Sequence, residues 1–134
     1  MIRFYLQKLV RDKVVKKCLD DPEFLHTEHR TLDKQAFRRE LLRKVHEEAD
    51  EIPLDDDQRD EALKELADLQ KVVDALRQDF GFSTEQVQEE MARKKQDNGG
   101  FDNRHYIEYN DFTDDSRWVE ILRAQPGKYR EEKS

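Results

Sequence analysis

The fold of this chain is decided by residues 44–73, whose sequence is KVHEEADEIPLDDDQRDEALKELADLQKVV. Apolar residues recur there at the three- and four-residue spacing of amphipathic helices. Two acidic clusters, in residues 47–51 and 65–68, interrupt that pattern on either side of Pro53. Carboxylates on the apolar side of a helix are costly to remove from water, so these clusters require a compensating partner.

The apolar spacing predicts two long helices, over residues 33–52 and 60–80. Thr31 or Asp33 can cap the first helix, and Gly81 is a suitable stop for the second. The polar connection between them is short, which predicts that the second helix folds back antiparallel to the first. The expected apolar stripes comprise Phe37, Leu41, Val45, Ala49 and Ile52 on the first helix, and Ala62, Leu66, Leu69, Val73, Leu76 and Phe80 on the second.

Further elements are expected on both sides of this helical hairpin. A helix is predicted near residues 11–19, and the capping box at residues 83–86 predicts another helix that ends before Gly99. Residues 104–109 suit a short strand or an extended segment, and residues 118–122 suit one more short element.

The expected fold class is therefore all-α. We expect an antiparallel helical bundle with a carboxylate metal site between two helices, followed by a short extended C-terminal segment. Residues 1–109 are predicted to form one domain, and residues 110–134 a partly ordered C-terminal extension.

The composition narrows the function. The 134 residues carry a formal net charge of −7, which argues against a nucleic-acid binder held by phosphate contacts. No apolar run approaches the roughly 18 residues of a membrane span, and no signal peptide is apparent, so a cytoplasmic location is expected. Hydrophobic residues make up only 35% of the chain and charged residues 43%, which favours a homo-oligomer that covers apolar faces.

The acidic clusters have a matching geometry on their two helices. Glu48 and Glu51 are three residues apart, as are Glu65 and Asp68, so each pair lies on one side of its helix. An antiparallel hairpin would bring the pairs face to face. Carboxylates alone suit hard cations, so Mg²⁺ is the expected cofactor and Mn²⁺ a possible substitute. The alternative is a wet edge where lysines such as Lys44 neutralise the carboxylates.

Three motifs together resemble the all-α nucleoside triphosphate pyrophosphohydrolases, which include MazG-like and phosphoribosyl-ATP pyrophosphohydrolase members. The first is the EExxE of residues 47–51, followed after 13 residues by the ExxD of residues 65–68. The second is KLVRDKV at residues 8–14. The third is KKQDNGGF at residues 94–101, where Asn98 departs from the arginine common in the family.

The resemblance implies a reaction and roles for particular residues. The reaction is Mg²⁺-dependent hydrolysis of a nucleoside triphosphate to a nucleoside monophosphate and pyrophosphate. The implied biological role is house-cleaning of the nucleotide pool. The implied metal ligands are Glu48, Glu51, Glu65 and Asp68. Glu47 and Glu48 are the candidate catalytic carboxylates, with Glu47 orienting or deprotonating the attacking water. The candidate substrate-binding residues are Lys8, Arg11, Lys94, Lys95 and Arg104.

The implied partner is a nucleotide substrate, with a homodimer or homotetramer completing the site. Hydrolysis of phosphoribosyl-ATP is an alternative within the same superfamily. A non-catalytic helical oligomerisation or regulatory protein is the alternative from a different class.

Overall fold

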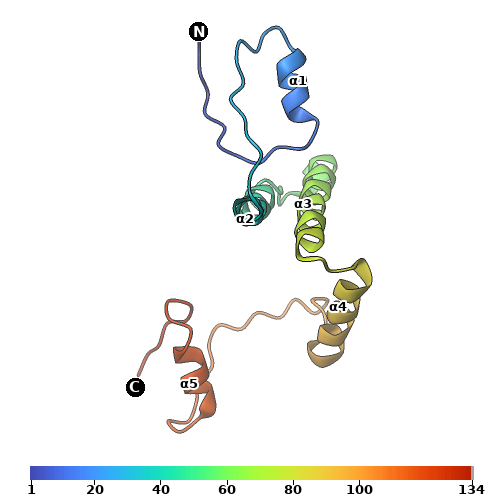
Figure 1. The fold of residues 1–134 in the computed structure, drawn as a ribbon. Coiled ribbons are helices and arrows are strands. Elements are labelled where there is room, and N and C mark those ends of the chain that lie inside the picture. Colours follow the sequence, from blue (N-terminus) through green and yellow to red (C-terminus); the bar gives the residue numbers. More distant parts are fainter. Residues whose placement is uncertain (134) are drawn as a thin grey trace. The chain divides into compact units, whose positions relative to one another are not determined.

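The computed structural model describes residues 1–133 as helices joined by irregular segments, and it has no β-strand among them. Figure 1 follows the helices in chain order. They are α1 (Val14–Asp20), α2 (Lys34–Asp50), α3 (Arg59–Phe80), α4 (Thr84–Asn98) and α5 (Arg117–Arg123), with a short 3₁₀ helix η1 (Asp56–Gln58) before α3. The all-α expectation is confirmed. The strand alternative for residues 104–109 is wrong, because no second strand in the described residues supplies hydrogen-bond partners.

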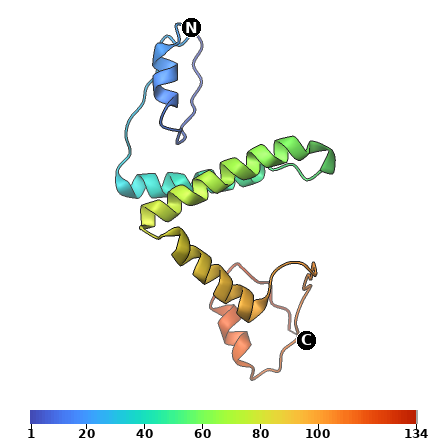
Figure 2. The same ribbon diagram turned by 90° about the vertical axis from the view of Figure 1, so that its right-hand side faces the viewer.

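The central feature is the helical hairpin formed by α2 and α3. The chain reverses through residues 51–58, so the two helices lie antiparallel and side by side (Figure 2). This packing is the most extensive between any two elements described. The predicted hairpin is therefore present, whereas a bundle of more helices stays a prediction.

Local sequence signals fix the helix ends. The side chain of Asp33 accepts a hydrogen bond of 2.8 Å from the backbone N–H of Ala36 and so caps α2. Gly81 ends α3 in the left-handed conformation with φ of 79°, which glycine adopts without steric cost. The capping box before α4 is complete. Ser83 accepts from the Gln86 N–H at 3.1 Å, and the Gln86 side chain accepts from the Ser83 N–H at 2.7 Å.

The face between α2 and α3 differs from the expected stripe. Leu41 on α2 and Val72 on α3 are buried, with exposed fractions of 2% and 8%. By contrast, Leu66, Val73 and Phe80 of the expected α3 stripe are exposed, whereas Ala62, Leu69 and Leu76 are half-buried, so the face that α3 turns toward α2 is rotated from the expected one. That face carries Glu65, Asp68 and Val72, which are three and four residues apart.

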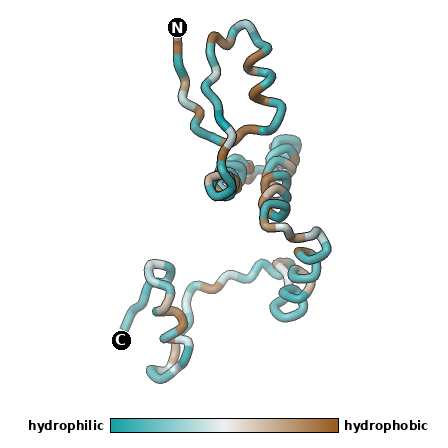
Figure 3. The backbone as a smooth tube through the Cα atoms, viewed as in Figure 1, coloured by the Kyte–Doolittle hydropathy of each residue, from teal (hydrophilic) through white to brown (hydrophobic). Residues whose placement is uncertain are grey.

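The chain divides into two compact units, Met1–Lys94 and the residues from Lys95 onward. The first contains α1, the hairpin and most of α4, a helix with no buried residue that is largely hydrophilic in Figure 3. In the second, Ser116 caps α5, and Arg123 forms an ion pair with Glu131. The predicted boundary between residues 109 and 110 stays a prediction. Among the described residues, no helix is both long enough and apolar enough to cross a bilayer.

Candidate metal centre

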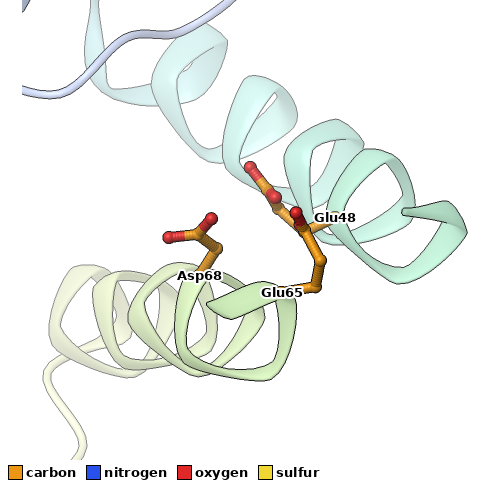
Figure 4. A group of neighbouring side chains, drawn as sticks. All are labelled: Glu48, Glu65 and Asp68. Atoms are coloured by element: carbon orange, nitrogen blue, oxygen red, sulfur yellow. The ribbon is translucent and has the colours of Figure 1, made fainter. Parts of the chain in front are cut away.

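Three carboxylates converge between the two helices of the hairpin. Glu48 projects from α2, and Glu65 and Asp68 project from α3 toward it (Figure 4). Each offers one oxygen, and these oxygens all lie within 4.8 Å of one another. The hairpin thus brings together three of the four expected metal ligands.

The positions of these side chains follow from the helix pairing. Glu65 and Asp68 lie one turn apart on α3, so both face the same stretch of α2. Glu48 is 8% exposed and lies two turns beyond the buried Leu41 along the same face. A carboxylate at that depth is costly unless a cation or donor compensates it.

Glu51, the fourth expected ligand, acts on the cluster electrostatically. Burial raises the pKa of Glu48, and the negative charge of Glu51 raises it further, against the opposing effect of Lys44. Loss of hydration, together with the neighbouring carboxyl groups of Glu61 and Glu51, raises the pKa of Glu65 from 4.5 to about 7. The site therefore binds protons more tightly than separate carboxylates would.

Glu61 is a neighbour that the sequence analysis missed. It precedes Glu65 by four residues on α3, so it lies one turn away on the same side of the helix. Its carboxyl group is close enough to raise the pKa of Glu65. The four-residue spacing was the available signal, but Glu61 lies outside both acidic motifs.

One oxygen of the cluster lacks a partner. The Oε2 atom of Glu65 is buried and has no hydrogen-bond partner among the described residues. Buried polar atoms are normally satisfied, and an unsatisfied one calls for an ion or a donor. An all-oxygen donor set with an orphaned carboxylate oxygen fits a hard divalent cation such as Mg²⁺ or Mn²⁺.

Basic residues from the N-terminal segment reach the acidic cluster. The Arg11 guanidinium lies 2.7 Å from the Asp68 carboxylate, although the two are 57 residues apart in sequence. Lys8 lies 3.7 Å from Glu47, a carboxylate that also lies 3.9 Å from Lys44. Two of the expected substrate-binding residues, Arg11 and Lys8, therefore lie beside carboxylates of the acidic motifs. Glu47 lies near the ammonium groups of both Lys8 and Lys44.

Lys44 supports part of the alternative interpretation. Its ammonium group lies 3.6 Å from Glu48, as the wet-edge interpretation expects. However, one ammonium shared between Glu47 and Glu48 leaves the buried oxygen of Glu65 without a partner. Lysine pairing therefore compensates the α2 side of the cluster and not the α3 side.

The remaining expected substrate-binding residues lie elsewhere along the chain. Lys94 is exposed on α4, where its charge helps to lower the pKa of Glu90, after the stronger effect of Arg93. Lys95 and Arg104 belong to the second unit. Asn98 is the last residue of α4, and Gly99 follows it with φ of 80°. Phosphate contacts by Lys94, Lys95 and Arg104 stay predictions.

Comparison with protein-family models, with curated proteins and with solved structures gives no match to this chain. The chemistry open to the carboxylate cluster therefore follows from its geometry and from the motifs in the sequence.

The Arg11–Asp68 ion pair makes a prediction about metal affinity. We expect Arg11→Gln to tighten Mg²⁺ binding by up to about fivefold, because a guanidinium no longer competes for Asp68; exposed pairs are worth at most about 1 kcal/mol. Isothermal titration of the metal measures this change. Arg43→Gln is the matched control, since Arg43 pairs with Glu40 on α2 instead of with the cluster. Equal Mg²⁺ affinities in the two variants would rule out the competition.

The raised pKa of Glu65 makes a prediction about pH. Because the folded state holds the Glu65 proton more tightly than the unfolded state does, this carboxyl contributes stability below pH 4.5 that is lost as the pH rises through about 7. Metal must displace the same proton, so stabilisation by Mg²⁺ should grow between pH 6 and pH 8. Melting curves with EDTA and with Mg²⁺ test both trends. A Mg²⁺ effect that is constant across this range would contradict the assignment.

Proposed function

We propose that this chain is a Mg²⁺-dependent nucleoside triphosphate pyrophosphohydrolase of the all-α type. The observation that carries the proposal is the convergence of Glu48, Glu65 and Asp68, together with a buried Glu65 oxygen that has no hydrogen-bond partner within residues 1–133. The motifs in residues 47–51, 65–68, 8–14 and 94–101 supply the choice of reaction.

The metal would be held by Glu48, Glu65 and Asp68, with Glu51 as a further ligand beside them. When bound, Mg²⁺ would neutralise charge on the triphosphate and make a water molecule more nucleophilic. The aligned carboxylates hold their positions because both helices of the hairpin are fixed by packing at Leu41 and Val72.

Glu47 is the proposed residue for orienting or deprotonating the attacking water, with Glu48 as the second catalytic carboxylate. Glu47 is half-buried on α2, one residue from the cluster. Its carboxylate lies 3.7 Å from the Lys8 ammonium and 3.9 Å from the Lys44 ammonium, and a carboxylate beside the metal ligands can accept a proton from water.

Arg11 and Lys8 are the proposed triphosphate contacts closest to the carboxylates. A guanidinium 2.7 Å from Asp68 is positioned to bind a phosphate oxygen next to a metal held by that carboxylate. Lys94, Lys95 and Arg104 are proposed as further contacts to the leaving pyrophosphate. The protein would act on the cytoplasmic nucleotide pool.

Self-association is part of the proposal. Leu63, Leu66 and Val73 lie on one side of α3, three and seven residues apart, and all three are exposed. An exposed apolar stripe on a central helix supports a homodimer or homotetramer in which a partner covers it.

A panel of substrates tests the function. Pyrophosphate release should be measured from deoxynucleoside, nucleoside and modified triphosphates and from phosphoribosyl-ATP, each with Mg²⁺ and with EDTA. Metal-dependent release from a triphosphate supports the proposal, and release from phosphoribosyl-ATP alone favours the related activity. Release from none of them would favour the non-catalytic oligomerisation protein.

A further inference from the structure

A groove with a basic rim and an apolar floor lies where α2 begins and α3 ends. Its lining includes Lys34, Arg38, Arg39 and Leu42 from α2, with Leu76 and Phe80 from α3. Leu42, the lining residue of α2 nearest to Glu48 in sequence, is six residues from it, or about 9 Å along a helix that rises 1.5 Å per residue, and none of the three converging carboxylates lines the groove. The groove is therefore separate from the carboxylate cluster.

The floor of the groove combines apolar and cationic character. Leu42 is 54% exposed and Phe80 is 50% exposed, so both side chains are available to a partner. The Arg38 guanidinium lies 3.7 Å from the centre of the Phe80 ring and 2.6 Å from Asp79, which leaves that cation already compensated. An occupant can therefore add aromatic or aliphatic contacts without displacing Arg38.

The rim carries two cations, Lys34 and Arg39, that have no partner within the described part of the chain. Neither Lys34 nor Arg39 has an ion pair or side-chain hydrogen bond among residues 1–133. The groove therefore suits a segment that presents carboxylates beside aromatic or aliphatic side chains.

The chain itself contains a segment with this chemistry. Residues 107–115 have the sequence IEYNDFTDD, with four carboxylates and no basic residue. Ile107 is 71% exposed and Tyr109 is 77% exposed. Within the described part of the chain, none of the four carboxylates forms an ion pair, and residues 107–112 have no regular secondary structure. The segment matches the groove in charge and in apolar content.

We propose that the groove binds residues 107–115 of a second copy of this chain. Two copies related by a twofold axis would exchange these segments, so that each groove receives the segment of the other chain. This contact is independent of nucleotide hydrolysis and assigns a role to the segment that spans the predicted boundary between residues 109 and 110.

Charge reversal on each side of the contact tests the proposal in the full-length protein. One variant carries Lys34→Glu with Arg39→Glu, and the other carries Asp111→Lys with Asp114→Lys. In each variant alone, the substituted positions of the groove and of the segment carry charges of the same sign, so self-association should weaken at least about tenfold. An equimolar mixture restores opposite charges at both contacts, so the mixture should regain association. Sedimentation velocity measures both effects.

Two controls keep the outcome unambiguous. Circular dichroism must show parental helix content in each variant. Lys128→Glu with Lys133→Glu gives the same change in net charge as Lys34→Glu with Arg39→Glu, at positions outside the groove and the segment. That control should associate like the parent. A monomeric parent, parental association by either test variant, or a mixture that stays dissociated would overturn the proposal. If association recovers only when all four substitutions are placed in the same chain, the groove and the segment contact each other within one chain, and the proposal is overturned.

Discussion

Glu65→Gln is expected to raise the melting temperature in EDTA at pH 8, where the Glu65 carboxyl is mostly ionised, and to reduce pyrophosphate release on the order of 100-fold or more. The amide keeps nearly the same volume but removes a negative charge from beside Glu51 and Glu61, so the metal-free protein loses repulsion. The same change removes a proposed metal ligand, and even substitution of a residue that only hydrogen-bonds to a metal ligand costs about 10–100-fold.

The response to Mg²⁺ should change in the opposite direction. At a concentration one hundredfold above its dissociation constant, Mg²⁺ stabilises the parent by about 2.7 kcal/mol. If Glu65→Gln weakens binding a hundredfold, the same concentration stabilises the variant by only about 0.4 kcal/mol. Thermal melts of both proteins, with EDTA and with Mg²⁺, measure the difference.

Glu61→Gln is the matched control for this experiment. Glu61 also raises the pKa of Glu65 from one turn away, but it lies outside the three converging carboxylates. It should therefore raise the melting temperature in EDTA while leaving most of the response to Mg²⁺. Identical Mg²⁺ responses in the parent and in Glu65→Gln would contradict the proposed ligand set.

Leu41→Ala is expected to lower the free energy of unfolding by about 2–5 kcal/mol. Leu41 is the least exposed side chain described, at 2%, and it packs where α2 meets α3. Such a loss is a large share of the roughly 5–15 kcal/mol that stabilises a small domain. Urea unfolding followed by circular dichroism measures it.

Leu54→Ala is the control for this second prediction. Leu54 lies in the connection between the helices and is 96% exposed, so its truncation should change stability by no more than about 0.5 kcal/mol. If Leu41→Ala proved equally mild, the hairpin interface would not be what holds the first unit together.

Features that depend on neighbouring residues were predictable from the sequence. Asp33 caps α2, Gly81 ends α3, and Ser83 with Gln86 opens α4, because each signal acts through backbone groups a few residues away. The antiparallel hairpin followed for the same reason, since a short polar connection leaves two helices little choice but to pack together.

The rotation of α3 about its axis was not predictable from apolar spacing. That spacing placed Leu66 and Val73 at the interface, but α3 turns Glu65, Asp68 and Val72 toward α2. Apolar periodicity treats every carboxylate as a solvent-facing residue, so it misplaces a helix whose contact face includes metal-ligand candidates.

Contacts between distant segments were also outside the reach of sequence patterns. The motif at residues 8–14 marked Arg11 as a candidate substrate-binding residue. Its partner, Asp68, is 57 residues away, and irregular segments between them determine the approach. The contribution of Glu61 to the pKa of Glu65 likewise depends on the side-chain positions around the site.

The most direct test of a metal centre formed by Glu48, Glu65 and Asp68 is a Mn²⁺ titration followed by electron paramagnetic resonance. Binding removes the signal of free Mn²⁺, so the titration counts sites and gives their affinity without requiring the right nucleotide. We expect the parent to bind Mn²⁺ saturably and in competition with Mg²⁺. This binding should be lost in Glu65→Gln and in Asp68→Asn, but retained in Glu61→Gln. Equal Mn²⁺ binding by all four proteins, or none by the parent, would contradict a metal centre between α2 and α3.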